Sequence, residues 1–214
     1  MTGVLGAEQR RAAASPMRER DSTARIGPNA VTRVAEALRV ELSEQSAESV
    51  FAAAGLLRYL AEPPQAMVDE TEVMRLHGAL RATLGLETAR RVSRRAGELT
   101  GDYLLAHRIP KAVQALLRVL PPLPAAHLLL AAIRRHAWTF AGSGRFTAVA
   151  ARPVRLAIAD NPLCRGEAAS QPLCDYYAGT FERLFRALVA RRTEAVETTC
   201  EACGSDACRF ELRW

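Results

Sequence analysis

The residues best suited to chemistry lie in the last third of the chain, where thiols and a carboxylate gather around a glycine turn. The segment from Glu197 to Cys208 also holds Cys200 and Cys203, and 22 residues separate Cys174 from Glu197. Thiolates at such spacings on a hairpin can converge on one ion without distorting the backbone, and a ligand from elsewhere completes a tetrahedron. The pattern predicts a closed, structural zinc site.

Two ligand sets fit this spacing. Cys174, Cys200, Cys203 and Cys208 would form an all-sulfur site, whereas Glu197 in place of Cys203 would give three sulfurs and one oxygen. Either set would fix the C-terminal hairpin to the segment that carries Cys174. An iron–sulfur cluster is the alternative occupant of the four-thiol set. A redox disulfide between Cys200 and Cys203 is disfavoured, because the pair lies at a strand turn and not at a helix N-terminus that would lower a thiol pKa.

Length and composition indicate one globular domain. The chain has 214 residues, of which 49% are hydrophobic and 24% charged, enough for a sizeable core. No apolar run approaches the length of a membrane span. The N-terminus lacks the apolar core of a signal peptide, and five cysteines at metal-like spacing disfavour a secreted disulfide framework. The sequence therefore predicts a cytoplasmic protein.

The net charge of +6 comes almost wholly from arginine, since Lys111 is the only lysine. The arginines are spread along predicted helices and do not form a stripe with interleaved aromatic residues, so nucleic-acid binding is not favoured. A basic surface of this kind suits an anionic ligand or peripheral contact with an anionic membrane. A homodimer and contacts with other proteins are compatible with the sequence.

The order of predicted elements divides the chain into a leader and one domain. Residues 1–26 lack periodicity and read as a disordered leader. Residues 27–136 are predicted to be helical, beginning at a cap provided by Asn29, and residues 137–214 to mix strands with one helix. The helices are expected at about 29–42, 46–62, 70–83, 86–107, 111–119 and 123–137.

The C-terminal part should form an antiparallel sheet. Glycines in the segment 138–146 predict a β-hairpin, and Val154, Leu156 and Ile158 alternate with polar or small residues as in a strand. Helical spacing returns over 172–191 and places Cys174 in the first turn of an amphipathic helix. A final hairpin is expected from 193–199 and 207–214. The predicted class is α+β, with helices packed on an antiparallel sheet.

With these residues in view, the C-terminal half resembles the 4-vinyl reductase domain family. This small-molecule-binding α/β domain is shared with aromatic-sensing modules of bacterial transcription activators and is akin to a vesicle-tethering subunit fold. In the sensor domains a cysteine, a glutamate and two further cysteines bind a structural zinc. The resemblance therefore implies Cys174, Glu197, Cys200 and Cys208 as the zinc ligands here.

Four further segments resemble the bacteriochlorophyll-biosynthesis member of that family, which is named for reducing a vinyl group on a tetrapyrrole ring. The resemblance covers about residues 27–214 and implies a tetrapyrrole as the ligand. The segments are Gly27-Pro28-Asn29-Ala30, residues Gly101 to Pro110, Ala137-Trp138-Thr139-Phe140-Ala141-Gly142-Ser143-Gly144 and Asn161-Pro162-Leu163-Cys164.

Several residues in these segments suit a magnesium tetrapyrrole. His107 could supply an axial imidazole, and it lies one helical turn from Tyr103 and next to Arg108, which could pair with a ring carboxylate. Trp138 and Phe140 would suit a flat apolar macrocycle, although aromatic residues beside a hairpin are more often part of the core.

Three functions are compatible with this sequence. Reducing a vinyl group requires two electrons and two protons, yet the chain has no Gly-x-Gly-x-x-Gly motif between a strand and a helix. Binding and delivery of the pigment intermediate is therefore favoured over a reductase that uses an external electron donor. A scaffold or tethering subunit is the third interpretation, and it would predict a large exposed apolar patch.

Overall fold

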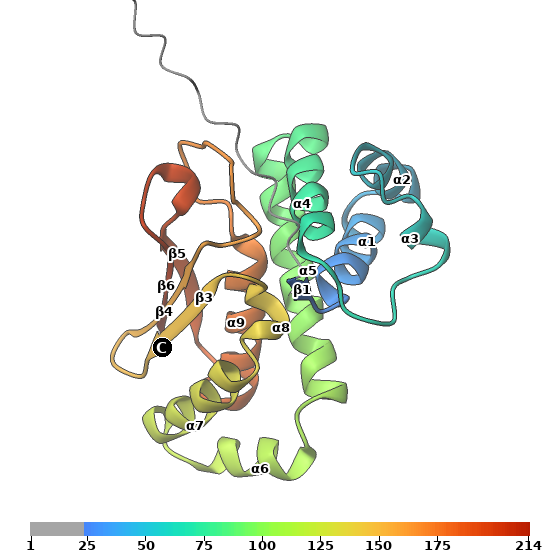
Figure 1. Ribbon diagram of the computed structural model, residues 1–214. Helices are drawn as coiled ribbons and strands as arrows, with labels where there is room; N and C mark the ends of the chain where they lie inside the picture. Colours follow the sequence, from blue (N-terminus) through green and yellow to red (C-terminus); the bar gives the residue numbers. More distant parts are fainter. Residues whose placement is uncertain (1–23) are drawn as a thin grey trace, which may run out of the picture.

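The computed structural model describes residues 24–214 of the chain (Figure 1). The predicted leader lies outside the described residues except for its last three positions. Within those, Arg25–Ile26 form β1, which pairs antiparallel with β2, Val68–Asp69. The confirmed class is α+β, with a helical N-terminal part and a four-stranded antiparallel sheet.

Helices occupy most of the chain up to residue 141. They are α1 (Asn29–Glu41), α2 (Glu44–Ala53), α3 (Arg58–Ala61), α4 (Glu70–Leu84), α5 (Leu86–His107), α6 (Lys111–Val119), α7 (Pro122–Arg135) and α8 (Trp138–Ala141). In Figure 1, α5 runs down the middle of the molecule, with α1 to α3 on one side and α9 and the sheet on the other. Among the described residues, no helix combines the length and the apolar character needed to cross a bilayer.

Two helix boundaries differ from the sequence-based expectation. The cap of α1 is Pro28, which has helical backbone angles and makes no side-chain hydrogen bond to the helix, so the predicted capping role of Asn29 is wrong. The helix expected over 46–62 ends at Ala53 instead. Gly55, whose φ is +70°, takes a left-handed conformation that ends α2 and lets the chain turn into α3.

The sheet follows α8 and has the strand order β3-β4-β6-β5. Its strands are β3 (Arg145–Val149), β4 (Val154–Ala159), β5 (Glu194–Thr199) and β6 (Cys208–Arg213). Val154, Leu156 and Ile158 are buried, as the alternating pattern predicted, and they face the core beneath α9 (Asp175–Leu188).

The segment predicted as a β-hairpin from residue 138 begins instead as the short helix α8. Gly142, with φ +57°, reverses the chain before β3 begins at Arg145. A buried carboxylate fixes this reversal, because Glu70 at the start of α4 accepts hydrogen bonds from the Ser143 backbone and hydroxyl at 2.8 and 2.7 Å. Arg165 pairs with the same carboxylate at 2.9 Å. The prediction of a hairpin turn at these glycines is therefore wrong, and the hairpin that the structure has consists of β3 and β4, which residues 150–153 join.

Helices α5 and α9 join the helical part to the sheet and approach each other closely. Gly97 and Gly101 on α5 face α9, and Gly179 on α9 faces α5. A Cβ on Gly101 would lie 2.7 Å from the Arg183 side chain, and one on Gly97 would lie 2.9 Å from the backbone nitrogen of Thr180. The Thr180 hydroxyl donates to the Gly97 carbonyl at 3.1 Å. Side chains larger than hydrogen would force the two helices apart.

Candidate metal centre

Four buried thiols meet where the sheet, α9 and the loop after β4 converge. Cys164 lies in that loop, Cys174 precedes the first residue of α9, Cys200 follows β5 and Cys208 begins β6. Their sulfur atoms all lie within 4.8 Å of one another, and none of the four residues is more than 1% exposed. Such a group could hold a metal ion.

The distances between the sulfurs match those around a single ion. Cys208 Sγ lies 3.4 Å from Cys164 Sγ, 3.6 Å from Cys174 Sγ and 3.8 Å from Cys200 Sγ, and the Cys174 and Cys200 sulfurs are 4.0 Å apart. Metal–sulfur bonds of about 2.3 Å in a tetrahedron place the sulfurs about 3.8 Å apart. In a four-iron cluster each thiolate binds a different iron atom, and in a two-iron cluster only pairs of thiolates share an iron, so several of the sulfur–sulfur distances would be longer. The arrangement therefore fits one tetrahedral ion.

Backbone and amide N–H groups point at two of the sulfurs. Asn161 Nδ2 donates to Cys174 Sγ at 3.2 Å, and the Glu201 backbone N–H donates to Cys208 Sγ at 3.4 Å. Donors of this kind stabilise thiolates, which are the metal-binding form of cysteine. Burial raises the pKa of the Cys174 thiol, so an uncompensated thiolate is costly there and a bound cation would offset that cost.

The loop that carries Cys164 is fixed independently of the thiols. The Glu201 carboxylate accepts the backbone N–H groups of Asp160 and Asn161 at 2.7 and 2.8 Å. The side-chain oxygen of Asn161, which is fully buried, accepts the Leu163 N–H at 3.0 Å. These bonds hold the loop against the β5–β6 turn, and they account for the position of Cys164 in the group.

The two other candidate ligands lie outside the four-thiol group. Glu197 on β5 accepts the Cys174 backbone N–H at 2.7 Å through Oε2, while its buried Oε1 has no hydrogen-bond partner in the described part of the chain. Burial and the charge of Cys200 raise the pKa of Glu197 to about 8. Cys203 lies in a short 3₁₀ turn, Glu201–Cys203, and is exposed. Glu197 is thus adjacent to the sulfurs, and Cys203 points to solvent.

The sequence-based ligand sets therefore overlap the group without matching it. Cys174, Cys200 and Cys208 come together as predicted, and the fourth sulfur belongs to Cys164, which neither set included. In the sequence, Cys164 stands out only as part of the segment 161–164, which carries the family resemblance. Cys164 and Cys174 are ten positions apart, which does not correspond to a regular metal-ligand spacing. The signal that could have pointed to Cys164 is that it is the fifth cysteine of a chain with few cysteines.

We expect Cys164→Ser to weaken metal binding more than Glu197→Gln does. Removing a direct thiolate ligand should lower affinity by more than about a hundredfold, whereas a neighbouring hydrogen-bonding group typically contributes about tenfold to a hundredfold. Competition with a chromophoric chelator measures both affinities on the purified variants. If Glu197→Gln releases the metal and Cys164→Ser retains it, the site has three sulfurs and one oxygen.

The residues predicted to contact a tetrapyrrole occupy two elements. At the end of α5, the rings of Tyr103 and His107 are 4.8 Å apart, and the Arg108 guanidinium lies 5.9 Å from the Tyr103 ring centre. His107 and Arg108 are exposed. The three side chains therefore form one accessible cluster, here called the Tyr103 cluster.

The other two candidates belong to α8 and differ in environment. Trp138 is 61% exposed. Phe140 is half-buried, with its ring 5.3 Å from that of Phe146, and its carbonyl accepts the Tyr177 hydroxyl at 2.9 Å. Phe140 thus belongs to an aromatic group that packs under the sheet, and Trp138 is available to a ligand or partner.

Comparison with known proteins relates the C-terminal part of the chain to a domain family and its fold to a solved structure. Residues 154–214 match the V4R domain family. This range includes all of β4, α9, β5 and β6. An Fe(II) unliganded H-NOX protein from K. algicida shares the fold, with a TM-score of 0.53, 12% identity and coverage of 88% of this chain and 96% of that one. The C-terminal part of the chain therefore matches the V4R domain, and the chain as a whole has an H-NOX-like arrangement of helices and sheet.

Sequence relatives narrow the assignment further. The chain is 46% identical over 188 residues to the bacteriochlorophyll synthase 23 kDa chain of Cereibacter sphaeroides, covering 88% of this chain and 90% of that one. It is 41% identical over 192 residues to the protein of the same name from Rhodobacter capsulatus, covering 90% and 88%. The chain belongs to the family of bacteriochlorophyll synthase 23 kDa chains, which confirms the resemblance found in its sequence.

Proposed function

We propose that this protein binds a vinyl-bearing tetrapyrrole intermediate of bacteriochlorophyll synthesis in the cytoplasm and assists or delivers it for vinyl-group reduction. The observation that carries the proposal is family membership over almost the whole chain, including the helical part that precedes the V4R domain. The ligand would be received from, and passed to, other enzymes of the pathway, and a homodimer is compatible with this role.

The same proposal gives the four-thiol site a structural zinc ion. Cys164, Cys174, Cys200 and Cys208 would hold it, with Glu197 as the alternative oxygen ligand. Zinc in a closed tetrahedron of thiolates contributes folding free energy and no redox chemistry. Here it would tie the loop after β4, the start of α9 and the β5–β6 hairpin together. Three segments between residues 164 and 208 would share one crosslink.

We propose that the tetrapyrrole contacts the residues expected from the sequence, which are the Tyr103 cluster together with Trp138 and Phe140. A magnesium tetrapyrrole accepts an axial imidazole, and His107 is exposed at the end of α5, where it can reach such a ligand. In the expectation based on sequence, Arg108 pairs with a ring carboxylate. The alternative function is a reductase that takes its two electrons from an external donor.

Purified alone, the protein is expected to bind a vinyl tetrapyrrole without reducing it. Titration with magnesium protoporphyrin IX should shift and sharpen its absorption band, because a flat macrocycle moves from water to an apolar surface. His107→Ala should weaken this shift, and the matched variant His127→Ala should not. His127 is exposed on α7, and its Nδ1 lies 3.0 Å from the Leu123 carbonyl oxygen of its own helix.

Two other outcomes would change the assignment. Steady conversion of a vinyl to an ethyl group by the isolated chain with reduced nicotinamide would establish the reductase. The absence of any spectral change with pathway tetrapyrroles would contradict both functions and leave the scaffold interpretation.

A further inference from the structure

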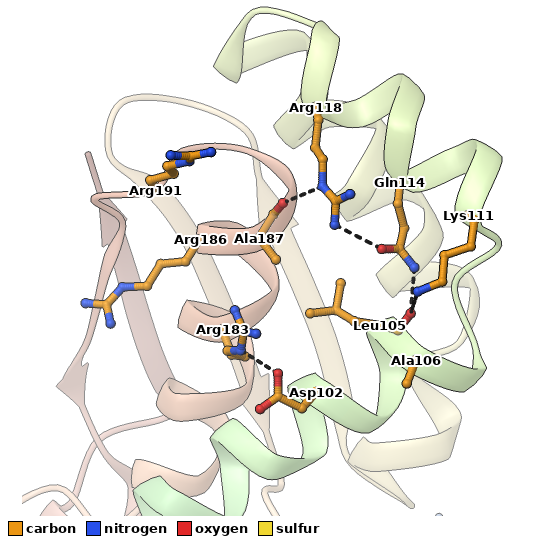
Figure 2. Close-up of a pocket in the computed structure, with 10 residues that line it drawn as sticks. All are labelled: Asp102, Leu105, Ala106, Lys111, Gln114, Arg118, Arg183, Arg186, Ala187 and Arg191. Carbon is orange, nitrogen blue, oxygen red and sulfur yellow. Dashed lines mark hydrogen bonds and ion pairs between the residues drawn. The ribbon is translucent and has the colours of Figure 1, made fainter.

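A basic pocket of about 550 Å³ lies between the end of α5, α6 and α9, apart from the cysteine group (Figure 2). Figure 2 shows side chains from α5 and α6 on one side, and side chains from α9 and the segment just after it on the other. Its lining combines an apolar base with long cationic side chains. The lining residues are Asp102, Leu105, Ala106, Lys111, Gln114, Arg118, Arg183, Arg186, Ala187 and Arg191.

Two of the cationic side chains already have carboxylate partners. Arg183 pairs with Asp102 at 2.6 Å, and Asp102 is the one carboxylate among the described residues that line the pocket. Arg186 pairs with Glu182 at 2.9 Å and donates to the Thr193 carbonyl at 2.7 Å. Arg183 therefore contributes little net charge to the pocket, whereas Arg186 shares the Glu182 carboxylate with Arg94 at 2.5 Å.

Three cations in the pocket lack a carboxylate partner among residues 24–214. Arg118 donates to the Ala187 carbonyl and to Gln114 Oε1, both at 3.1 Å, which positions its guanidinium between α6 and α9. Lys111 has one weak contact, 3.4 Å to the Leu105 carbonyl, and Arg191 is exposed with no ion pair to any described residue. Uncompensated like charges around a concave surface create a positive potential that concentrates anions.

The apolar part of the lining indicates what kind of anion fits. Leu105, Ala106 and Ala187 lie beside the three cations, so a ligand with an apolar body and a carboxylate would satisfy both. Arginine matches the planar geometry of a carboxylate, and a volume of this size suits a small-molecule ligand. A tetrapyrrole with carboxylate side chains has this chemistry.

We infer that the basic pocket binds the side-chain carboxylates of the tetrapyrrole, with Lys111, Arg118 and Arg191 as its cationic contacts. The inference rests on the proposed function. It goes further by stating where on the protein the carboxylates of the ligand bind. It also differs from the expectation based on sequence, in which Arg108 meets the carboxylate. Arg108 stacks near Tyr103, whereas Asp102, Leu105 and Ala106 of the same helix line the pocket.

The test compares magnesium protoporphyrin IX with its dimethyl ester, which keeps the macrocycle and both vinyl groups but blocks the carboxylates. Both probes are titrated in the same detergent against the full-length protein and against Lys111→Gln and Arg191→Gln. Neither side chain bonds a carboxylate, so both variants should fold. Arg192→Gln is the matched control, since it removes the same charge from the exposed neighbour of Arg191, outside the pocket.

We expect each pocket variant to weaken binding of the free acid by about threefold to fivefold, the upper part of the range for one solvent-accessible ion pair. The same variants should leave binding of the ester unchanged, and Arg192→Gln should affect neither probe by more than about twofold. If the wild type binds the acid and the pocket variants bind it equally well, the inference is wrong and the proposed function stands. If the wild type binds neither probe, the proposed function fails and the inference with it.

Discussion

Cys174→Ser is expected to release the metal and unfold the C-terminal hairpin. The Cys174 sulfur lies 3.6 Å from Cys208 Sγ and 4.0 Å from Cys200 Sγ, and it accepts the Asn161 amide. Serine supplies a harder oxygen, and protonated it is a poor zinc ligand. Structural zinc contributes binding free energy of roughly 10–16 kcal/mol that is also folding free energy. The loss should therefore be several kcal/mol, a large part of the stability of a domain.

Elemental analysis of the purified protein and urea unfolding measure these two effects. Cys203→Ser is the control, because the chemical change is the same and the side chain is exposed. It should retain the metal and change the free energy of unfolding by less than about 0.5 kcal/mol. Metal loss in Cys203→Ser but not in Cys164→Ser would establish the all-sulfur set that includes Cys203. Iron with a visible charge-transfer band would refute zinc.

Gly97→Ala is expected to destabilise the protein by about 3 kcal/mol or more. A Cβ at this position would overlap the Tyr176 carbonyl oxygen and lie 2.9 Å from the Thr180 nitrogen, and both are backbone atoms of α9 that cannot move aside singly. The helices would have to separate, which would also break the bond from the Thr180 hydroxyl to the Gly97 carbonyl. Intrinsic helix propensity favours alanine over glycine by about 1 kcal/mol, so a net loss isolates the packing effect.

Gly78→Ala is the matched control in a neighbouring helix. Its added Cβ would lie 3.2 Å from a Glu167 carboxylate oxygen, the end of a flexible side chain that pairs with Arg81. That oxygen can move by a few tenths of an ångström, so stability should stay the same or rise by up to about 1 kcal/mol. Chemical denaturation of both variants gives the comparison. Equal behaviour of Gly97→Ala and Gly78→Ala would show that the α5–α9 contact tolerates a wider separation.

The sequence by itself determined those features that depend on neighbouring residues. The 3.6-residue periodicity over 86–107 and 111–119 predicted α5 and α6 with the bounds that the structure has. The alternation from Val154 to Ala159 predicted β4 and its buried face. Cys200 and Cys208 were predicted to converge because a hairpin fixes the distance between its own arms. In each case the interaction is local, so spacing along the chain carries the information.

Only the tertiary structure decided which distant residues meet. Cys164 enters the thiol group because Glu201 binds the backbone of its loop, a contact between residues about 40 apart that leaves no spacing pattern. The segment that begins at residue 138 is the short helix α8 and not a strand. Gly142 ends this helix, and the buried carboxylate of Glu70 on α4 fixes the reversal by accepting the Ser143 backbone N–H. The basic pocket likewise combines α5, α6 and α9, and cations that are scattered in the sequence share one concavity only after packing. Long-range packing sets these positions, since the free energy comes from burial and pairing that no single segment contains.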